Sequence, residues 1–168
     1  VWTGPNDVIR GEDADEFEDE LEDIFGRLRD RTDGLIVAGN IPDLTELPRF
    51  RADPDEDVTR DRIEAFNDAI AEQAEDYEVL VVDLYAEPVE DDLVSDVDGF
   101  HPNNQGHRRV AEEFLEVILP ALGLAPASLR LRGELVRTGS LVVGFGLPLL
   151  RDDQPALRLG AATARLDA

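Results

Sequence analysis

The chain has 168 residues, which suits a single domain and is too short for two independent cores of average size. Hydrophobic residues make up 42% of it, enough to bury a core, so a wholly disordered chain is excluded. The formal net charge of -23 disfavours nucleic acid and anionic lipid as partners, and the absence of cysteine excludes disulfides, thiol catalysis and cysteine-ligated metals.

Two kinds of apolar pattern alternate along the first part of the chain. Val1-Trp2-Thr3 has the character of the last residues of a strand. Apolar residues recur at helical spacing in three stretches, which predicts helices over 12–31, over 59–77, and from Val110 to near Pro120–Gly123. Two continuous apolar runs predict buried strands over 35–39 and 79–84, the second one covered on both faces.

This alternation predicts an α/β fold with three layers, in which a parallel sheet carries helices on both faces. Functional sites in such sheets form at the carboxyl ends of the strands. We therefore look for chemistry in the segments that follow each predicted strand.

Charge divides the sequence into two parts of different character. Residues 1–127 have a formal balance of -25, whereas residues 128–168 have a balance of +2. We expect 1–127 to be an acidic, partial α/β domain and 128–168 to be an appended segment.

All 16 basic side chains are arginines, because the sequence contains no lysine. An excess of acid without lysine resembles the composition of proteins from high-salt environments, where screening weakens the repulsion between like charges. The composition therefore predicts a halophilic protein.

The longest apolar run, Leu141 to Leu150, contains two glycines and a proline. It is far shorter than the roughly 20 residues that a membrane-spanning helix needs. We expect a soluble protein without a membrane span, with the cytoplasm favoured. A signal peptide cannot be judged from a sequence that starts at Val1, and the oligomeric state is left open.

The first candidate for chemistry is a histidine in a loop shaped by glycine and proline, Asp98-Gly99-Phe100-His101-Pro102. A carboxylate three residues before an imidazole can accept the Nδ1 proton and leave Nε2 free as a general base. The alternative is a loop histidine with an incidental acid nearby. The other histidine, His107, opens a helix and is assigned a structural role.

The second candidate is Gly4-Pro5-Asn6-Asp7, which follows the first predicted strand. An asparagine at the carboxyl end of a strand can donate its side-chain amide to a developing oxyanion. The alternative is an ordinary turn, since these are common turn residues.

Together, in this order and separation, the two segments resemble the later portion of the SGNH hydrolase family, also called GDSL lipases and esterases. Gly4-x-Asn6-Asp7 is similar to the third conserved block of that family, and Asp98-x-x-His101-Pro102 to its fifth. The resemblance covers about residues 1–122 and implies the flavodoxin-like fold of these hydrolases.

The resemblance also implies a reaction, the hydrolysis of a small-molecule carboxylic ester through a serine acyl-enzyme. His101 would be the general base and Asp98 would orient it, while Asn6 would bind the oxyanion and Gly4 would shape its turn. No metal or organic cofactor is implied.

The first two blocks of the family, which hold the serine and an oxyanion glycine, are not found ahead of Gly4. Ser95, Ser128 and Ser140 are the serines of the chain, and Ser95 lies too near Asp98 in sequence for attack beside His101. We therefore expect an N-terminally truncated hydrolase, with a non-catalytic remnant or binding module of the same fold as the alternative.

Two weaker patterns complete the candidates. Gly139-Ser140-Leu141-x-x-Gly144-x-Gly146 partly resembles the missing serine block, which would make the chain a circular permutation. Asp53-x-Asp55-x-Asp57 has acids at calcium-loop spacing, but Val58 occupies the position that needs glycine. We favour an ordinary apolar loop for the first pattern and solvated acids for the second.

Overall fold

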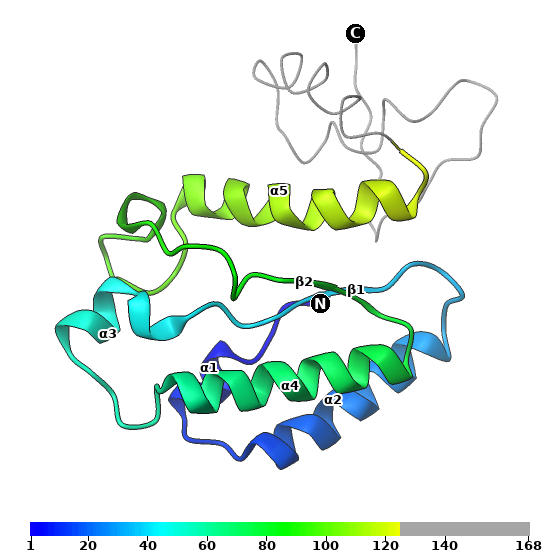
Figure 1. The fold of residues 1–168 in the computed structure, drawn as a ribbon, viewed down its shortest axis with the longest axis horizontal. Coiled ribbons are helices and arrows are strands. Elements are labelled where there is room, and N and C mark those ends of the chain that lie inside the picture. The colour runs from blue at the N-terminus through cyan, green and yellow to red at the C-terminus, as the bar shows by residue number, and fades with distance from the viewer. Residues whose placement is uncertain (125–168) are drawn as a thin grey trace, which may run out of the picture. The chain divides into compact units, whose positions relative to one another are not determined.

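Two short parallel strands form the centre of the fold in the computed structural model, which describes residues 1–124 (Figure 1). Strand β1 (Val37–Gly39) pairs with strand β2 (Leu80–Val82), with Ala38 opposite Val81. Trp2 forms a parallel bridge with Gly39, whose N–H donates to the Val1 carbonyl, while the next N–H, of Asn40, donates to Val82. β1 therefore lies between the N-terminal residues and β2, and the predicted parallel pairing is confirmed.

Two long amphipathic helices pack against each other beneath the strands in Figure 1, helix α2 (Ala14–Arg29) and helix α4 (Arg60–Asp76). Each begins at the capping residue that its sequence offers. The Asp13 carboxylate accepts from the N–H of Asp15, and the Thr59 hydroxyl accepts from the N–H of Arg62.

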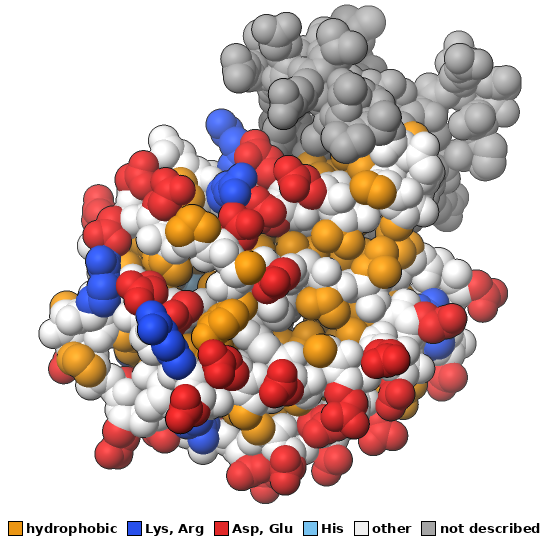
Figure 2. Space-filling view, viewed as in Figure 1, with side chains coloured by type: hydrophobic (Ala, Val, Ile, Leu, Met, Phe, Trp, Pro, Cys, Tyr) orange, Lys and Arg blue, Asp and Glu red, His pale blue; other side chains and the backbone are white. Residues whose placement is uncertain are grey.

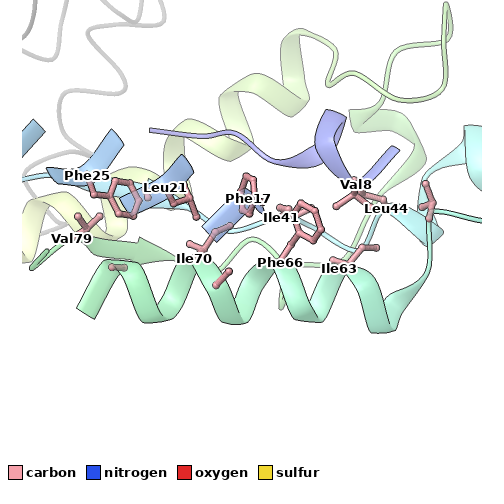
Figure 3. Packing of buried hydrophobic residues seen from close by; sticks show 14 of the residues in the cluster. Val8, Phe17, Leu21, Phe25, Ile41, Leu44, Ile63, Phe66, Ile70 and Val79 are labelled. Atoms are coloured by element: carbon pink, nitrogen blue, oxygen red, sulfur yellow. The ribbon is translucent and has the colours of Figure 1, made fainter. Parts of the chain in front are cut away.

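The contact between these two helices is the main hydrophobic core. The rings of Phe17 and Phe66 stack with centroids 4.6 Å apart, and a row of apolar side chains continues along both helices (Figure 3). Short segments outside the two helices complete the core, and its fully buried side chains are Val8, Leu21, Phe25, Ile41, Leu44, Ile63, Phe66 and Ile70.

The third long helix, α5 (Asn104–Ala121), lies above the strands in Figure 1 and contacts both of them. Its Phe114 ring approaches Gly39 so closely that a Cβ at that glycine would lie 3.0 Å from it. Helices thus cover both faces of the parallel pair, as in a three-layer α/β fold.

Four short elements were not predicted from the sequence, because a single helical turn has no apolar period to detect. They are helix α1 (Pro5–Ile9), the 3-10 helix η1 (Leu44–Glu46), helix α3 (Pro48–Ala52) and the 3-10 helix η2 (Asp91–Leu93). All four lie in the segments that follow Trp2, β1 and β2 along the chain.

The strands are shorter than predicted, and their side chains are less buried. Leu35, expected to begin the first strand, lies outside β1 with 42% of its surface exposed, and Leu80 of β2 is 36% exposed. Leu35 precedes β1, and Leu80 is the first residue of β2, so both exposed side chains lie at the start of the strand region. Ile24, predicted to face the core from α2, is also exposed.

Some predictions fall outside the described residues. The boundary between 127 and 128, Ser128, and the Gly139–Gly146 motif with Ser140 belong to this group. Among residues 1–124, no helix has both the length and the apolar character that crossing a bilayer requires.

Candidate active site

Trp2, the end of β1 and the end of β2 are neighbours in the sheet, and polar residues follow each of them. Asn40 comes directly after β1, and its Nδ2 donates to Oδ1 of Asp83, which follows β2, at 2.8 Å. The Asn40 Oδ1 accepts the N–H of Tyr85 at 2.9 Å. The Asn40 amide thereby holds together the two segments that follow β1 and β2. These segments leave the sheet at the edge where the candidate site lies.

Asn6 lies in the first turn of α1, a short helix at the place where the sequence left an ordinary turn as the alternative. Gly4 caps this helix with φ of 104°, a conformation that favours glycine, and Pro5 takes the first helical position. A Cβ at Gly4 would lie 2.6 Å from Cδ1 of Ile41, so the backbone of Gly4 packs directly on that side chain. Both the conformation and the close contact therefore require glycine here.

His101 is held by Asp98 in the manner that the sequence predicted. The His101 Nδ1 and the Asp98 Oδ2 are 2.7 Å apart, and the Asp98 Oδ1 accepts the backbone N–H groups of Phe100 and His101, each at 3.0 Å. One carboxylate thus closes the turn with one oxygen and orients the imidazole with the other.

These hydrogen bonds also set the charge of Asp98. The N–H of Phe100, followed by the His101 ring and the N–H of His101, lowers the pKa of Asp98 from 3.8 to about 2. Asp98 is therefore ionised at neutral pH, which favours Nδ1–H as the tautomer of His101 and leaves Nε2 as the acceptor.

The loop that carries His101 is anchored by its neighbours. The Phe100 ring meets the His101 ring edge-on, with centroids 4.8 Å apart, and it also packs edge-on against Phe50 of α3. The Gly99 carbonyl accepts the N–H of Arg49, also in α3. Helix α3, which the sequence did not predict, is thus the support for this loop.

Asn103 is a positioning residue that the sequence reasoning missed. Its Oδ1 accepts the N–H groups of Gln105 and Gly106 at the start of α5, and its Nδ2 donates to the carbonyls of Asp92 and Val94. The usable signal was an asparagine directly before a helix, which is a common capping residue. Asn103 fixes the start of α5 to η2 two residues after His101.

A pocket of about 380 Å³ brings the predicted groups together. Gly4, Asn6 and His101 all line it, while Asp98 is not among its lining residues and contacts His101 from beside it. The pocket also has an apolar lining, which includes Trp2, Leu44, Leu47, Leu84, Val94, Phe100 and Val110. Apart from Phe100, which lies in the His101 loop, these apolar residues come from segments far apart in the sequence and carry no motif that marks them as parts of a site.

One wall of the pocket carries an ion-pair network. Arg109 of α5 contacts Glu87 at 2.6 Å and Glu113 at 2.8 Å. The hydrogen bond that Arg109 donates to Glu87 raises the pKa of Arg109, and burial raises the pKa of Glu113. Two carboxylates therefore neutralise the guanidinium, so this wall presents no net positive charge to a bound molecule.

The other candidates from the sequence add no further catalytic group to Asp98 and His101. Ser95 does not line the pocket, and its hydroxyl accepts the N–H of Val97 at 3.2 Å. His107 lines the pocket, which leaves the structural role predicted for it untouched. Within residues 1–124, the histidine and acidic side chains form no group of three that could hold a metal ion, and the Asp53–Asp57 stretch is no exception.

Comparisons with known proteins bear on the family and the fold. The sequence pattern of the GDSL-like lipase/acylhydrolase family matches residues 1–109. The fold is similar to that of LAE5, an alpha/beta hydrolase enzyme from the metagenome of Lake Arreo, Spain, with 24% identity and a TM-score of 0.52. That match covers 69% of this chain and 56% of LAE5, so the chain spans little more than half of its neighbour. No curated protein matches the chain.

Proposed function

Because the chain belongs to the GDSL-like lipase/acylhydrolase family, we propose that it supplies the acid–base pair and an oxyanion donor of a serine hydrolase. The substrate class is a small carboxylic ester, such as an acyl ester or an acetylated sugar. One observation carries the proposal: His101, held by Asp98 at 2.7 Å, lines the same pocket as Asn6.

In the proposed mechanism His101 moves the protons. Its Nε2 takes the proton of the attacking serine hydroxyl and then gives it to the departing alcohol. In the second half of the reaction it takes a proton from the water that attacks the acyl-enzyme and gives it to the serine oxygen as the acyl–serine bond breaks. The lowered pKa of Asp98 supports its role, since a carboxylate that stays ionised stabilises the imidazolium formed in each step.

Asn6 is the proposed oxyanion donor. Its side-chain amide would donate to the negative oxygen of the tetrahedral intermediate, while Gly4 sets the turn that presents it. A donor of this kind lowers the barrier by about 3–4 kcal/mol. No step of this mechanism needs a metal or an organic cofactor.

The nucleophile is proposed to be a serine on a segment ahead of Val1. The geometry of Ser95 supports this, since its hydroxyl is engaged within its own loop and is not among the pocket residues. Ser140, in a permuted arrangement, is the second candidate.

Hydrolysis of p-nitrophenyl acetate and butyrate tests the proposal in two forms of the protein. We expect the 168-residue chain to show little or no turnover, and the chain extended through its upstream coding sequence to show turnover. In the extended form, His101→Ala should abolish it, and Asn6→Ala should lower kcat by about 10²–10³-fold. Asn104→Ala is the matched control, because this asparagine is exposed and lies outside the pocket lining.

Two results would replace the proposed function with one of its alternatives. Turnover by the 168-residue chain that disappears in Ser140→Ala would establish the permuted arrangement. An extended chain that binds esters without hydrolysing them would identify a binding module of the same fold.

A further inference from the structure

Asn67, in the middle of α4, holds the backbone of Ile41 with both ends of its side-chain amide. Its Oδ1 accepts the N–H of Ile41 at 2.8 Å, and its Nδ2 donates to the carbonyl of the same residue at 2.9 Å. Ile41 lies two residues beyond β1, so a helix below the sheet fixes the chain just where it leaves a strand.

An asparagine at this place is not explained by the helix itself. Asparagine is a poor residue for a helix interior, because its short amide competes for backbone hydrogen bonds. Here that amide bonds to a residue 26 positions away in sequence. The role of Asn67 is therefore to hold the backbone of Ile41.

Gly4 in turn packs against the side chain of Ile41. The Ile41 side chain is fully buried, and Figure 3 shows it in the packed row beside Phe66 and Phe17. A Cβ at Gly4 would lie 2.6 Å from Ile41 Cδ1 and 3.1 Å from Phe17 Cζ. The space beside Gly4 is thus filled by the Ile41 and Phe17 side chains, so the position of Ile41 bears on the packing of Gly4.

Gly4 sets the direction of α1. Its carbonyl accepts the N–H groups of Asp7 at 2.9 Å and Val8 at 3.0 Å, which closes the helical turn that contains Asn6. A continuous chain of contacts therefore runs from Asn67 through Ile41 and Gly4 to Asn6.

We propose that Asn67 is a positioning residue for Asn6, acting through the backbone of Ile41 and the contact of Ile41 with Gly4. The catalytic meaning of this placement rests on the proposed function, since it is Asn6 that would donate to the oxyanion. The placement itself concerns the folded chain alone. Shifts of about 1 Å at a reacting centre can cost on the order of 10²-fold in rate, so a remote residue with this role matters.

The placement is tested by NMR of the asparagine side-chain amides. The chain has five asparagines, so labelling asparagine with ¹⁵N gives a spectrum simple enough to assign, and Asn6→Asp identifies the Asn6 signals by their loss. Asn67→Asp keeps the acceptor for the Ile41 N–H but places an oxygen against the Ile41 carbonyl. We expect this variant to shift or broaden the Asn6 amide signals.

Gln73→Ala is the matched control, because Gln73 lies on the same helix and also uses its amide in a long-range bond, to Glu18 at 2.9 Å. A merely structural role of Asn67 would affect Asn6 no more than this control does. Asn6 signals that stay in place in a folded Asn67→Asp variant would overturn the proposal.

A second variant covers the case in which Asn67→Asp does not fold. Ile41→Val removes the methyl group nearest Gly4 and leaves both hydrogen bonds of Asn67 intact, a change that cores tolerate. It should shift the Asn6 signals in the same way, and unchanged signals would again overturn the proposal.

Kinetics separate this inference from the proposed function. In the hydrolytic form of the protein, Asn67→Asp should lower kcat by about 10–100-fold with KM nearly unchanged, because an oxyanion donor acts in the transition state. If no form hydrolyses esters, the proposed function fails, while the NMR result still decides whether Asn67 places Asn6.

Discussion

At the scale of single residues, the candidate site depends on side chains that each hold more than one group. Asp98 is the clearest case, since its two oxygens receive two backbone N–H groups and the imidazole of His101. Such a carboxylate both shapes the loop and fixes the orientation of the ring. The same three bonds make the ionised form of Asp98 the stable one in the folded chain.

This gives a prediction for stability in acid. The pKa of Asp98 is about 2 in the folded chain, below its ordinary value of 3.8. The ionised group therefore stabilises the fold at all pH values above 3.8, and this contribution is lost as the pH falls through about 2. Asp98→Asn removes the titration. We expect the difference in free energy of unfolding between wild type and Asp98→Asn to be constant near neutral pH and to shrink between pH 3.8 and 2.

Urea denaturation followed by circular dichroism, at constant ionic strength, measures that difference. Asp96→Asn is the control, because Asp96 lies in the same loop and makes no side-chain hydrogen bond within the described part of the chain. A difference between wild type and Asp98→Asn that persists unchanged at pH 2 would show that the loop does not lower the pKa of Asp98.

Part of the candidate site could be predicted from the sequence, from one local motif and from the expected order of strands and loops. Asp98 and His101 are three positions apart, and the predicted bond between them is present. Asn6 and His101 were expected in one cleft because both follow strands of a parallel sheet, and both line the pocket. Asn67 acts on the backbone of Ile41, 26 positions away, so no local pattern marks it, whereas Asn103 had the local signal of a capping residue directly before a helix.

At the scale of elements, the long helices were predictable and the short ones were not. The apolar period over 59–77 gives α4 to within a residue at each end, because Thr59 is a capping residue and the period is sustained. α1 and α3 are single turns that form because proline begins each of them and their neighbours cover them. Their existence depends on tertiary contacts that the sequence does not display.

Two helical glycines allow a test of how closely the elements pack. Gly26 lies in α2, and a Cβ there would lie 3.4 Å from the Tyr77 ring, an ordinary contact. Alanine is a better helix former than glycine, so Gly26→Ala should stabilise the chain by about 0.5–1 kcal/mol. Gly106 lies in the first turn of α5, where a Cβ would lie 2.1 Å from the Leu93 carbonyl oxygen.

The same substitution should therefore have opposite signs at the two positions. Gly106→Ala forces α5 away from η2, and we expect it to destabilise the chain by about 1–3 kcal/mol. Thermal melts of both variants at one salt concentration give the comparison. Stabilisation by Gly106→Ala would show that α5 does not start against Leu93.

At the scale of the whole molecule, charge is the dominant feature. Acidic side chains spread over the face seen in Figure 2, with only a few basic ones among them. The surface of α2 shows the consequence, because acids four positions apart, such as Asp15 and Asp19 or Glu16 and Glu20, share one side of the helix. The ion pair of Arg27 with Asp23, at 2.7 Å, offsets only part of this repulsion.

The composition therefore predicts that salt stabilises the fold. Like charges four residues apart on a helix cost roughly 0.2–0.5 kcal/mol per pair. The Debye length falls from about 30 Å at 0.01 M salt to about 3 Å at 1 M, so molar salt removes most of this repulsion. With a net charge of -23, we expect the midpoint of thermal unfolding to rise steadily with sodium chloride, and the chain to be partly unfolded in dilute buffer.

Circular dichroism melts across a salt series measure this dependence, and α2 provides its matched control. A variant with Asp15, Glu16, Asp19 and Glu20 replaced by their amides has four fewer charges and the same shape, so its unfolding midpoint should rise less steeply with salt. Screening predicts this flattening, whereas a general effect of salt on apolar burial leaves the slope of the variant equal to that of the wild type. A wild-type midpoint that stays flat or falls between low and molar salt would reject the halophilic interpretation of the composition, because the repulsion that salt relieves would then contribute nothing measurable to the folded state.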